Sequence, residues 1–335
     1  MKVVTFGELM LRLSPEGNER LFQSERMRWY FGGSEANVAI SVNNFGGASA
    51  YVTKLPRNPV GEAAVQTLRA LGVDTSGIAR GGERMGAYFF ERGVPPRAPV
   101  CVYDRANSAI AKAQKEDFDW DEIFRDADWF HFSGITPALG GALPEICEAA
   151  CKAARERGVP VSCDLNYRGQ LWSREEACRT MSRLCQWVDV CIANDEDAED
   201  VFGIQPPDGV TGREGYLSIA QQLTERFGFR QVALILRIPE GMAYRLTGLL
   251  YDGNSRTAYA APEHSLHIVE RVGAGDAFCG GLIFALCDGM QPQDAVEFGV
   301  AASALKHGVE GDYNLVSAEE VRRTMLQVRA SAAAK

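Results

Sequence analysis

The chain has 335 residues, with 44 Asp and Glu against 35 Lys and Arg, which gives a formal net charge of −9. This length supports a large core without disulfides or structural metals, and the acidic balance argues against a broad nucleic-acid-binding surface, which needs many basic side chains. The sequence has no apolar run of about 18 residues and no secretory signal pattern, so we expect a cytoplasmic protein without nucleic-acid or membrane partners.

The first part of the chain alternates between strand-like and helical patterns. Residues 2–6 are a short apolar run, and the spacing of apolar side chains over 34–45 predicts a helix. A second strand-like run covers 48–54. Asn58 before Pro59 then indicates a helix start, because a cap residue followed by proline favours the first helical turn.

Between these elements lie β-like runs rich in aromatic residues and arginine. They cover 9–15 with 27–31, and 85–93 with 98–105, and no helical pattern separates the members of each pair. We interpret them as a small antiparallel sheet inserted into the larger domain, which is a candidate lid. Ordinary edge hairpins are the alternative that the pattern leaves open.

The alternation continues through the second part of the chain. Further strand-like runs cover 127–132, 159–163, 188–193 and 231–236. A helical pattern over 143–157 separates the first two, and capping-box spacing at Ser173 with Glu176 and at Ser317 with Glu320 marks two later helix starts. Strands separated by such helices predict a mostly parallel sheet covered on both faces, with ligands beyond the carboxyl ends of the strands.

The nine cysteines follow no C-x-x-C spacing. Most lie in apolar stretches, so we expect small buried hydrophobic residues in a reducing compartment. His264 and His267 lie in an alternating stretch that places them on opposite faces of a strand, which argues against a shared metal.

The strongest local motif is the segment from Val272 to Gly281, which joins a β-like run over 265–271 to an apolar helix-length segment. The small residues at 273–275 let backbone N–H groups converge at a helix start, where the dipole favours an anion. A dinucleotide fingerprint would need glycine where Phe278 stands, and a P-loop would need a Gly-Lys pair, which the sequence lacks. Asp276 is either a general base beside a transferring phosphoryl group or a residue that complements the helix dipole.

A second motif follows the first lid run. Gly32 and Gly33 permit close approach of a ligand to the backbone, and Asn37 offers a donor and an acceptor from the first helical turn. By itself this motif is equally typical of a plain turn with a helix start.

Together, the Gly-Gly-x-x-x-Asn and Gly-Ala-Gly-Asp motifs resemble the two signatures of the ribokinase-like (PfkB) carbohydrate kinases. The resemblance covers the whole chain and implies one doubly wound α/β domain over 1–335 with a lid from about 9–32 and 84–107. It also implies ATP as the phosphoryl donor, Asp276 as the base that deprotonates a sugar hydroxyl, and an anion hole formed by Gly273, Ala274 and Gly275.

Further motifs are similar to the branch of this family that phosphorylates 2-keto-3-deoxygluconate. They are Ser133–Leu139, Asp164–Arg168 and Val102–Ala109. The resemblance implies a substrate site formed by Gly33, Ser34, Asn37, Tyr88, Tyr103, Arg105, Ile135, Arg168, Asp276 and Asp312. It implies an ATP site formed by Asn166, Arg168, Asn194, Arg237, Gly273 and Gly275. A carboxylate in a closed pocket needs a cation, and a bidentate arginine supplies one, so Arg105 is the candidate that separates an acid from a neutral sugar.

Some positions depart from the family pattern. Glu270 and Arg271 stand where Asp-Thr is frequent, so a monovalent-cation site there is doubtful. Asp197 ends the element that organises magnesium, and we expect it to act through water. The nucleotide loop reads 236–241 without its usual Leu-Gly, so its adenine contacts do not transfer.

Two alternatives remain, one within the same class of enzyme and one outside it. One is a kinase for fructose, ribose or a nucleoside, and the other is a sugar-binding relative without catalysis. The aromatic residues Trp29, Tyr30 and Phe31 of the lid would suit a homo-oligomer formed through the lid, and covering the sugar is the alternative role that the sequence leaves open for them.

Overall fold

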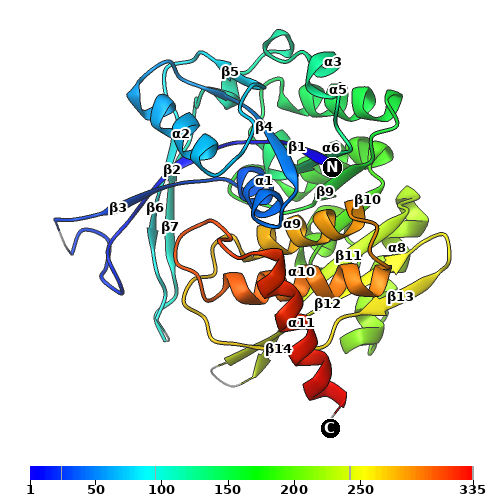
Figure 1. The fold of residues 1–335 in the computed structure, drawn as a ribbon. Coiled ribbons are helices and arrows are strands. Elements are labelled where there is room, and N and C mark those ends of the chain that lie inside the picture. Colours follow the sequence, from blue (N-terminus) through cyan, green and yellow to red (C-terminus); the bar gives the residue numbers. More distant parts are fainter. Residues whose placement is uncertain (24, 95, 241–242, 334–335) are drawn as a thin grey trace.

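The computed structural model describes residues 1–23, 25–94, 96–240 and 243–333 (Figure 1). Its strands are β1 (Lys2–Phe6), β2 (Met10–Ser14), β3 (Arg28–Gly32), β4 (Ala48–Leu55), β5 (Ile78–Arg80), β6 (Gly86–Glu91), β7 (Val100–Asp104), β8 (Trp129–Ser133), β9 (Val161–Asp164), β10 (Val190–Ala193), β11 (Gln231–Glu240), β12 (Ala243–Asp252), β13 (Thr257–Ala260) and β14 (His264–Leu266). Its α-helices are α1 (Ser34–Asn44), α2 (Pro59–Ala70), α3 (Trp120–Ile123), α4 (Ile135–Ala138), α5 (Leu143–Glu156), α6 (Arg174–Leu184), α7 (Asp195–Phe202), α8 (Gly212–Phe227), α9 (Ala274–Cys287), α10 (Pro292–Lys306) and α11 (Ala318–Ala333). Three 3₁₀ turns are η1 (Ile110–Lys112), η2 (Lys115–Asp117) and η3 (Cys185–Trp187).

The central sheet has the strand order β13-β12-β11-β10-β9-β8-β1-β4-β5, and β14 pairs with β12. Every pairing from β11 through β10, β9, β8, β1 and β4 to β5 is parallel. β12 pairs antiparallel with β11, β13 and β14. The predicted mostly parallel α/β sheet is therefore confirmed, with an antiparallel extension at one edge.

Helices cover both faces of this sheet because its strands carry apolar side chains on both sides. Successive residues of β1 point to opposite faces, so Val3 packs with Val38 of α1 and Phe278 of α9, whereas Val4 packs with Ile146 of α5. Helices α1, α9 and α10 thus lie over one face, and α5, α6 and α8 lie over the other (Figure 1).

The predicted helix starts are confirmed by their hydrogen bonds. The Asn58 side chain accepts from the Gly61 amide at 3.0 Å at the start of α2. Ser173 and Glu176 form the expected reciprocal capping box on α6. The same pattern joins Ser317 to Glu320 before α11.

The lid is a separate four-stranded sheet in the order β3-β2-β6-β7, and it projects from one side of the α/β body (Figure 1). Its outer pairings, β2 with β3 and β6 with β7, are antiparallel, as expected for two hairpins. The inner pairing of β2 with β6 is parallel, which the sequence analysis did not predict. Both strands leave the central sheet shortly after a parallel strand, β1 or β5, and therefore enter the lid in the same direction.

One predicted element is shorter than expected. The β-like run over 265–271 forms a strand only within β14, and the residues that follow have no strand partner among the described residues. Instead, the amides of Val269 and Glu270 both donate to the carbonyl of His307, at 2.8 and 3.1 Å. The segment is therefore anchored to the end of α10 and not to the sheet.

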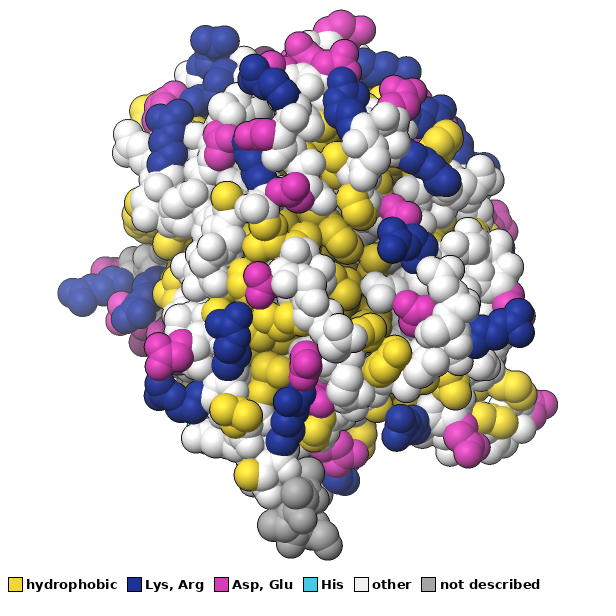
Figure 2. All heavy atoms as spheres, turned by 45° about the vertical axis from the view of Figure 1, so that its right-hand side comes forward, with side chains coloured by type: hydrophobic (Ala, Val, Ile, Leu, Met, Phe, Trp, Pro, Cys, Tyr) yellow, Lys and Arg dark blue, Asp and Glu magenta, His cyan; other side chains and the backbone are white. Residues whose placement is uncertain are grey.

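Most of the cysteines are buried, as their apolar sequence surroundings predicted. Six cysteines are buried and three are partly exposed. Figure 2 shows acidic and basic side chains interspersed over the face that it draws, without a broad area of one sign. Within the described ranges, no helix is long and apolar enough to cross a membrane.

Candidate active site

A cavity of about 480 Å³ lies beyond the carboxyl ends of the central parallel strands and beside the lid. The lid contributes residues of β2, β6 and β7, and the main domain contributes the ends of β9 and β10 and the start of α9. Of the predicted site residues, these line the cavity: Gly33, Ser34, Asn37, Tyr88, Tyr103, Arg105, Ile135, Asn166, Arg168, Asn194, Asp197, Arg237, Gly273, Gly275, Asp276 and Asp312. Segments far apart in sequence thus meet at one site.

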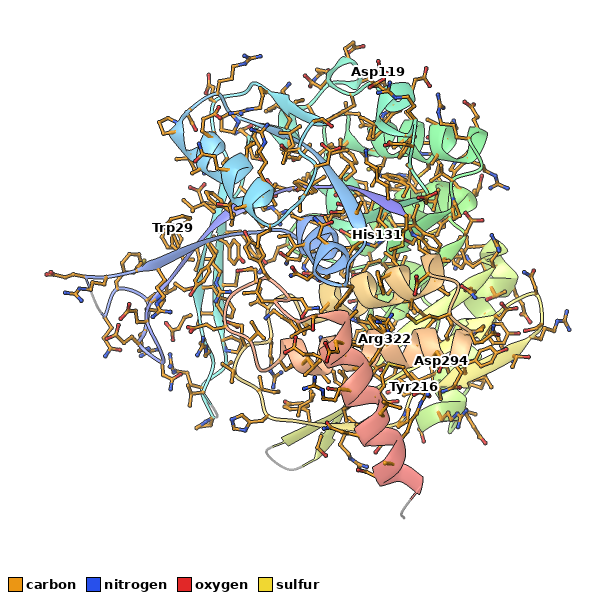
Figure 3. All side chains as sticks on the ribbon, viewed as in Figure 1. Trp29, Asp119, His131, Tyr216, Asp294 and Arg322 are labelled. Carbon is orange, nitrogen blue, oxygen red and sulfur yellow. The ribbon has the colours of Figure 1, made fainter. Side chains whose placement is uncertain are left out.

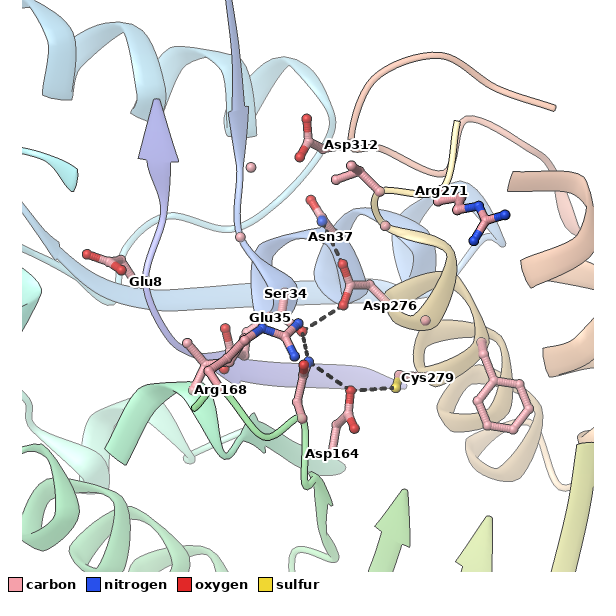
Figure 4. A pocket seen from close by; sticks show the side chains of 18 of the residues that line it. Glu8, Ser34, Glu35, Asn37, Asp164, Arg168, Arg271, Asp276, Cys279 and Asp312 are labelled. Carbon is pink, nitrogen blue, oxygen red and sulfur yellow. Dashed lines mark hydrogen bonds between the residues drawn. The ribbon is translucent and has the colours of Figure 1, made fainter. Parts of the chain in front are cut away.

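Asp276 is held by two donors from the first Gly-Gly motif (Figure 4). Its Oδ1 accepts from the Ser34 hydroxyl at 2.7 Å, and its Oδ2 accepts from Asn37 Nδ2 at 2.7 Å. Both donors lie on the first turn of α1, which packs against α9. The two motifs therefore form one site, in which two hydrogen bonds fix the orientation of the Asp276 carboxylate.

The electrostatic environment makes Asp276 a stronger base than an exposed aspartate. Burial raises its pKa above the ordinary 3.8, while the hydrogen bonds from Asn37 and Ser34 and the charge of Arg168 lower it. Asp276 is only partly buried, and it faces the cavity. A carboxylate in this setting can take a proton from a bound hydroxyl.

The turn before α9 explains its glycine. Gly273 precedes the helix with φ 78°, in the left-handed region that glycine adopts without strain. A Cβ on it would lie 2.1 Å from the carbonyl oxygen of Asp312. The first-turn amides of a helix have no intrahelical acceptor, so those of α9 that face the cavity can bind an anion.

Ala274 is the one predicted site residue that does not line the cavity. Its side chain is fully buried, and its amide donates to the carbonyl of Arg271 at 3.2 Å. Because this donor already has an acceptor, Ala274 does not belong to the predicted anion hole. The Ala277 amide is also occupied, since it donates to the Gly273 carbonyl at 2.8 Å, so the hole is limited to Gly273, Gly275 and Asp276.

The lid side of the cavity contains an ion pair that the sequence analysis missed. Arg105 Nε donates to Glu8 Oε2 at 2.8 Å, and its Nη2 donates to the same oxygen. The hydroxyl of Ser108 donates to the other oxygen, Glu8 Oε1, at 2.6 Å. Glu8 lies two residues after the end of β1, and a charged residue just beyond a buried parallel strand is the signal that would have identified it.

Arg12 is a second residue that the sequence analysis did not identify. It is 2% exposed, although it lies in a lid strand. Its Nη1 donates to Asp312 Oδ2 at 3.0 Å and its Nη2 donates to Glu270 Oε2 at 2.8 Å. The hydroxyl of Tyr88 donates to Asp312 Oδ1 at 2.5 Å. Asp312 is thus fixed by two lid residues at the edge of the cavity.

The ends of β9 and β10 place carboxylates at the other end of the cavity. Asp164 Oδ2 accepts from Asn166 Nδ2 at 3.1 Å, and burial together with the Asp197 and Asp276 charges raises the pKa of Asp164 well above 3.8. Asp197 Oδ1 accepts from the Tyr167 amide at 2.8 Å. Arg168, from the same loop, directs its guanidinium towards Ser34 and Asp276 (Figure 4).

The carboxylates of Asp164 and Asp197 are the candidate groups for holding magnesium. Among the described residues, no group of three or more acidic, histidine or cysteine side chains is arranged to hold a metal. Asp164 and Asp197 nevertheless both face the cavity, and burial raises both pKa values, so a cation between them would relieve the cost of their charges. This donor set fits an ion that keeps several waters and binds chiefly through phosphate oxygens, as magnesium does.

The predicted nucleotide loop is described only in part. Arg237 lies on β11, and its partly solvent-exposed side chain lines the cavity. Gly241, the last residue of that predicted loop, lies outside the described residues.

Two side chains orient the Asp276 carboxylate beside the amino-terminal amides of α9, and the lid lies next to it. This arrangement is typical of an enzyme that transfers a phosphoryl group to a small polar substrate. The model of the pfkB family of carbohydrate kinases matches residues 1–319, and the chain belongs to this family. The predicted ribokinase-like fold with its lid and the predicted class of enzyme, a carbohydrate kinase, are confirmed.

Three similar proteins have been named by substrate. The 2-dehydro-3-deoxygalactonokinase of Haloferax volcanii is 34% identical over 324 residues, covering 97% of this chain and 96% of the relative. The 2-dehydro-3-deoxygluconokinase of Thermoproteus tenax is 28% identical over 316 residues, covering 93% and 90%. The crystal structure of 2-dehydro-3-deoxygluconokinase from Thermotoga maritima has a TM-score of 0.93 and 47% identity, covering 97% of this chain and 98% of that one.

Proposed function

We propose that the protein transfers the γ-phosphoryl group of ATP to 2-keto-3-deoxygluconate and forms its 6-phosphate. The observation that carries the proposal is the placement of Asp276 between Ser34 and Asn37, in a cavity that also contains Arg105 and Arg168. The names of the three similar proteins, all kinases of 2-keto-3-deoxy sugar acids, support the substrate class.

The site residues divide the chemistry between them. Asp276 takes the proton from the attacking hydroxyl, while Ser34 and Asn37 keep its carboxylate in position. The backbone amides of Gly275 and Asp276, at the start of α9, stabilise the charge that develops on the transferring group. Magnesium, held through water by Asp164 and Asp197, would neutralise charge on the nucleotide phosphates.

Of the two arginines in the cavity, Arg168 gives it the preference for an acid, because Arg105 is already paired with Glu8. Arg168 donates to the carbonyl of Tyr167 at 2.9 Å and lines the cavity, so its charge faces a bound ligand. Arg105 shares its charge with Glu8 and forms part of the lid wall with Tyr103, whose ring lies 5.3 Å from the guanidinium carbon. A neutral sugar would not use the charge of Arg168.

The experiment is a measurement of ADP formation with ATP and magnesium over a panel of substrates. The panel contains 2-keto-3-deoxygluconate, its galactonate epimer, fructose, ribose and a nucleoside, and the phosphorylated position of the product is determined by NMR. We expect the highest kcat/KM with one of the two 2-keto-3-deoxy acids. A higher kcat/KM with fructose, ribose or the nucleoside would refute the acid specificity, and no ADP formation with any of them would favour a binding protein.

We also propose that the chain is one catalytic unit whose lid, about 9–32 and 84–107, closes on the sugar and pairs with a second copy. Figure 3 shows Trp29 on the lid, away from the central sheet. Trp29 is 59% exposed and Val102 is 50% exposed, which is a reason to cover this face. Light scattering after gel filtration tests this, and a monomer unaffected by Val102→Lys would refute it. Use of ATP supports a cytoplasmic location.

A further inference from the structure

Lys306 is a buried cation to which the proposed chemistry assigns no role. It is the last residue of α10 and is fully buried. Its Nζ donates to two backbone carbonyls, those of Val309 and Gly311, both at 2.9 Å. A compact positive charge surrounded by backbone carbonyl oxygens is the environment that proteins otherwise provide for an alkali cation.

The loop that accepts these hydrogen bonds is in direct contact with the active-site turn. The carbonyl of Asp312 lies against Gly273, where a Cβ would be 2.1 Å away, and the same Cβ would be 3.3 Å from Lys306 Cε. The carbonyl of His307 accepts from the amides of Val269 and Glu270. Lys306 therefore connects the 307–312 loop to the turn that begins α9.

The charges around Lys306 favour a cation at this position. Glu270 and Asp312 act on it from the two segments that it connects, and Arg12 joins the same two carboxylates from the lid. Burial lowers the pKa of Lys306 to about 8, while Glu270 and Asp312 raise it. The side chain is therefore mostly charged at neutral pH, and the cost of burying it is offset by two carbonyls and two carboxylates.

The sequence analysis left a monovalent-cation site near Glu270 and Arg271 in doubt. The residues present do not fit a free ion beside this turn, because the Val309 and Gly311 carbonyls already accept from an ammonium group. We propose that Lys306 is a fixed internal cation that positions the 307–312 loop and the Gly273 turn, so that phosphoryl transfer needs no dissociable monovalent cation. This inference rests on the proposed kinase activity, and it names Lys306 as a positioning residue.

The test compares the wild-type protein with Lys306→Ala in potassium, ammonium and tetramethylammonium chloride at one ionic strength. We expect wild-type kcat to be the same in all three salts. In tetramethylammonium, Lys306→Ala should lose about 10- to 100-fold in kcat, the effect of removing hydrogen bonds from a charged group, with a smaller change in KM. Potassium or ammonium, which can occupy the vacated position, should restore much of the loss. Lys152→Ala, which replaces an exposed lysine on α5, is the control, and its kcat should be the same in all three salts.

The pH dependence of kcat distinguishes a charged positioning role of Lys306 from a purely structural one, which would not change with pH. The charged and titratable groups that face Lys306 are Glu270, Asp312, Asp276 and Arg12, with His307 adjacent in sequence. Wild-type kcat should fall as the pH rises through about 8, where Lys306 loses its proton. Lys306→Ala rescued by potassium should not show this fall.

Unfolding does not explain the expected fall. The folded pKa of Lys306 lies below its ordinary 10.5, so between about 8 and 10.5 the unfolded chain binds more protons, and the contribution of this group to stability rises with pH.

The melting temperature separates a failure of this proposal from a failure of the proposed function. Potassium should raise the melting temperature of Lys306→Ala above its value in tetramethylammonium and leave that of the wild type unchanged, and this requires no substrate. Wild-type turnover that needs potassium would overturn the proposal. So would full turnover of Lys306→Ala in tetramethylammonium, or a folded Lys306→Ala that no cation rescues. Should Lys306→Ala not fold, the salt series and pH profile of the wild type decide.

Discussion

The substitution Asp276→Asn separates the chemistry of the site from its geometry. The asparagine can keep both native contacts, because its carbonyl oxygen can accept from Asn37 Nδ2 and its amide can donate to the Ser34 hydroxyl, which can also act as an acceptor. The change therefore removes the negative charge and the proton acceptor while it preserves shape and hydrogen bonding.

General-base catalysis contributes about 10²- to 10⁴-fold to a rate, so we expect kcat to fall by that factor, which corresponds to about 2.7–5.5 kcal/mol in the barrier. KM for the sugar acid should change little. The assay is ADP release under saturating ATP and magnesium, together with sugar binding by calorimetry. Asp288→Asn, at the exposed carboxyl end of the same helix, is the control and should keep wild-type kcat.

Stability should move in the opposite direction to activity. Burial raises the folded pKa of Asp276 above 3.8, so the folded state binds the proton more readily, and at pH values above the raised pKa the ionised carboxylate costs stability. Asp276→Asn removes this cost and should melt at the same or a higher temperature than the wild type at neutral pH. A kcat within tenfold of the wild type, or a loss of turnover that only accompanies a lower melting temperature, would refute the role of Asp276 as base.

Further substitutions test the arginines and the glycine turn. Arg168→Gln should raise KM for the sugar acid about 10- to 100-fold at an unchanged melting temperature. Arg105→Gln should also destabilise the fold by about 3–5 kcal/mol, because it leaves the Glu8 carboxylate buried without its cation. Equal melting temperatures of the two variants would contradict this difference. Gly273→Ala should destabilise the fold by about 1–3 kcal/mol, because residue 273 has a positive φ and its Cβ would meet the Asp312 carbonyl. A Cβ on Gly275 meets nothing within 4 Å, so Gly275→Ala should lower kcat at unchanged stability. Denaturant unfolding measures the stability of these variants, and steady-state kinetics measures their kcat and KM. A loss of stability in Gly275→Ala would contradict the open space that the structure shows beside Gly275.

Most of the fold could be predicted from local patterns. The Asn58 and Ser173 caps and the apolar strand runs depend on residues near in sequence, and each forms as predicted. The strand predicted over 265–271 forms only in part, because local β-propensity does not account for distant partners. Here the carbonyl of His307 accepts the amides of Val269 and Glu270. The parallel pairing of β2 with β6 likewise depends on how two distant segments leave the central sheet.

The sequence alone placed Asp276, the glycines beside it and Asn37 at two helix starts, because glycine and polar residues at such positions form a local pattern. Their predicted roles came from the resemblance of the two motifs to a known family. Only the tertiary structure showed that Arg105 is paired with Glu8, or that Lys306 is buried among carbonyls below the active-site turn. A charged residue is normally exposed, and nothing in its neighbouring sequence tells which distant groups will surround it. The burial and pairing of charges are properties of the assembled fold.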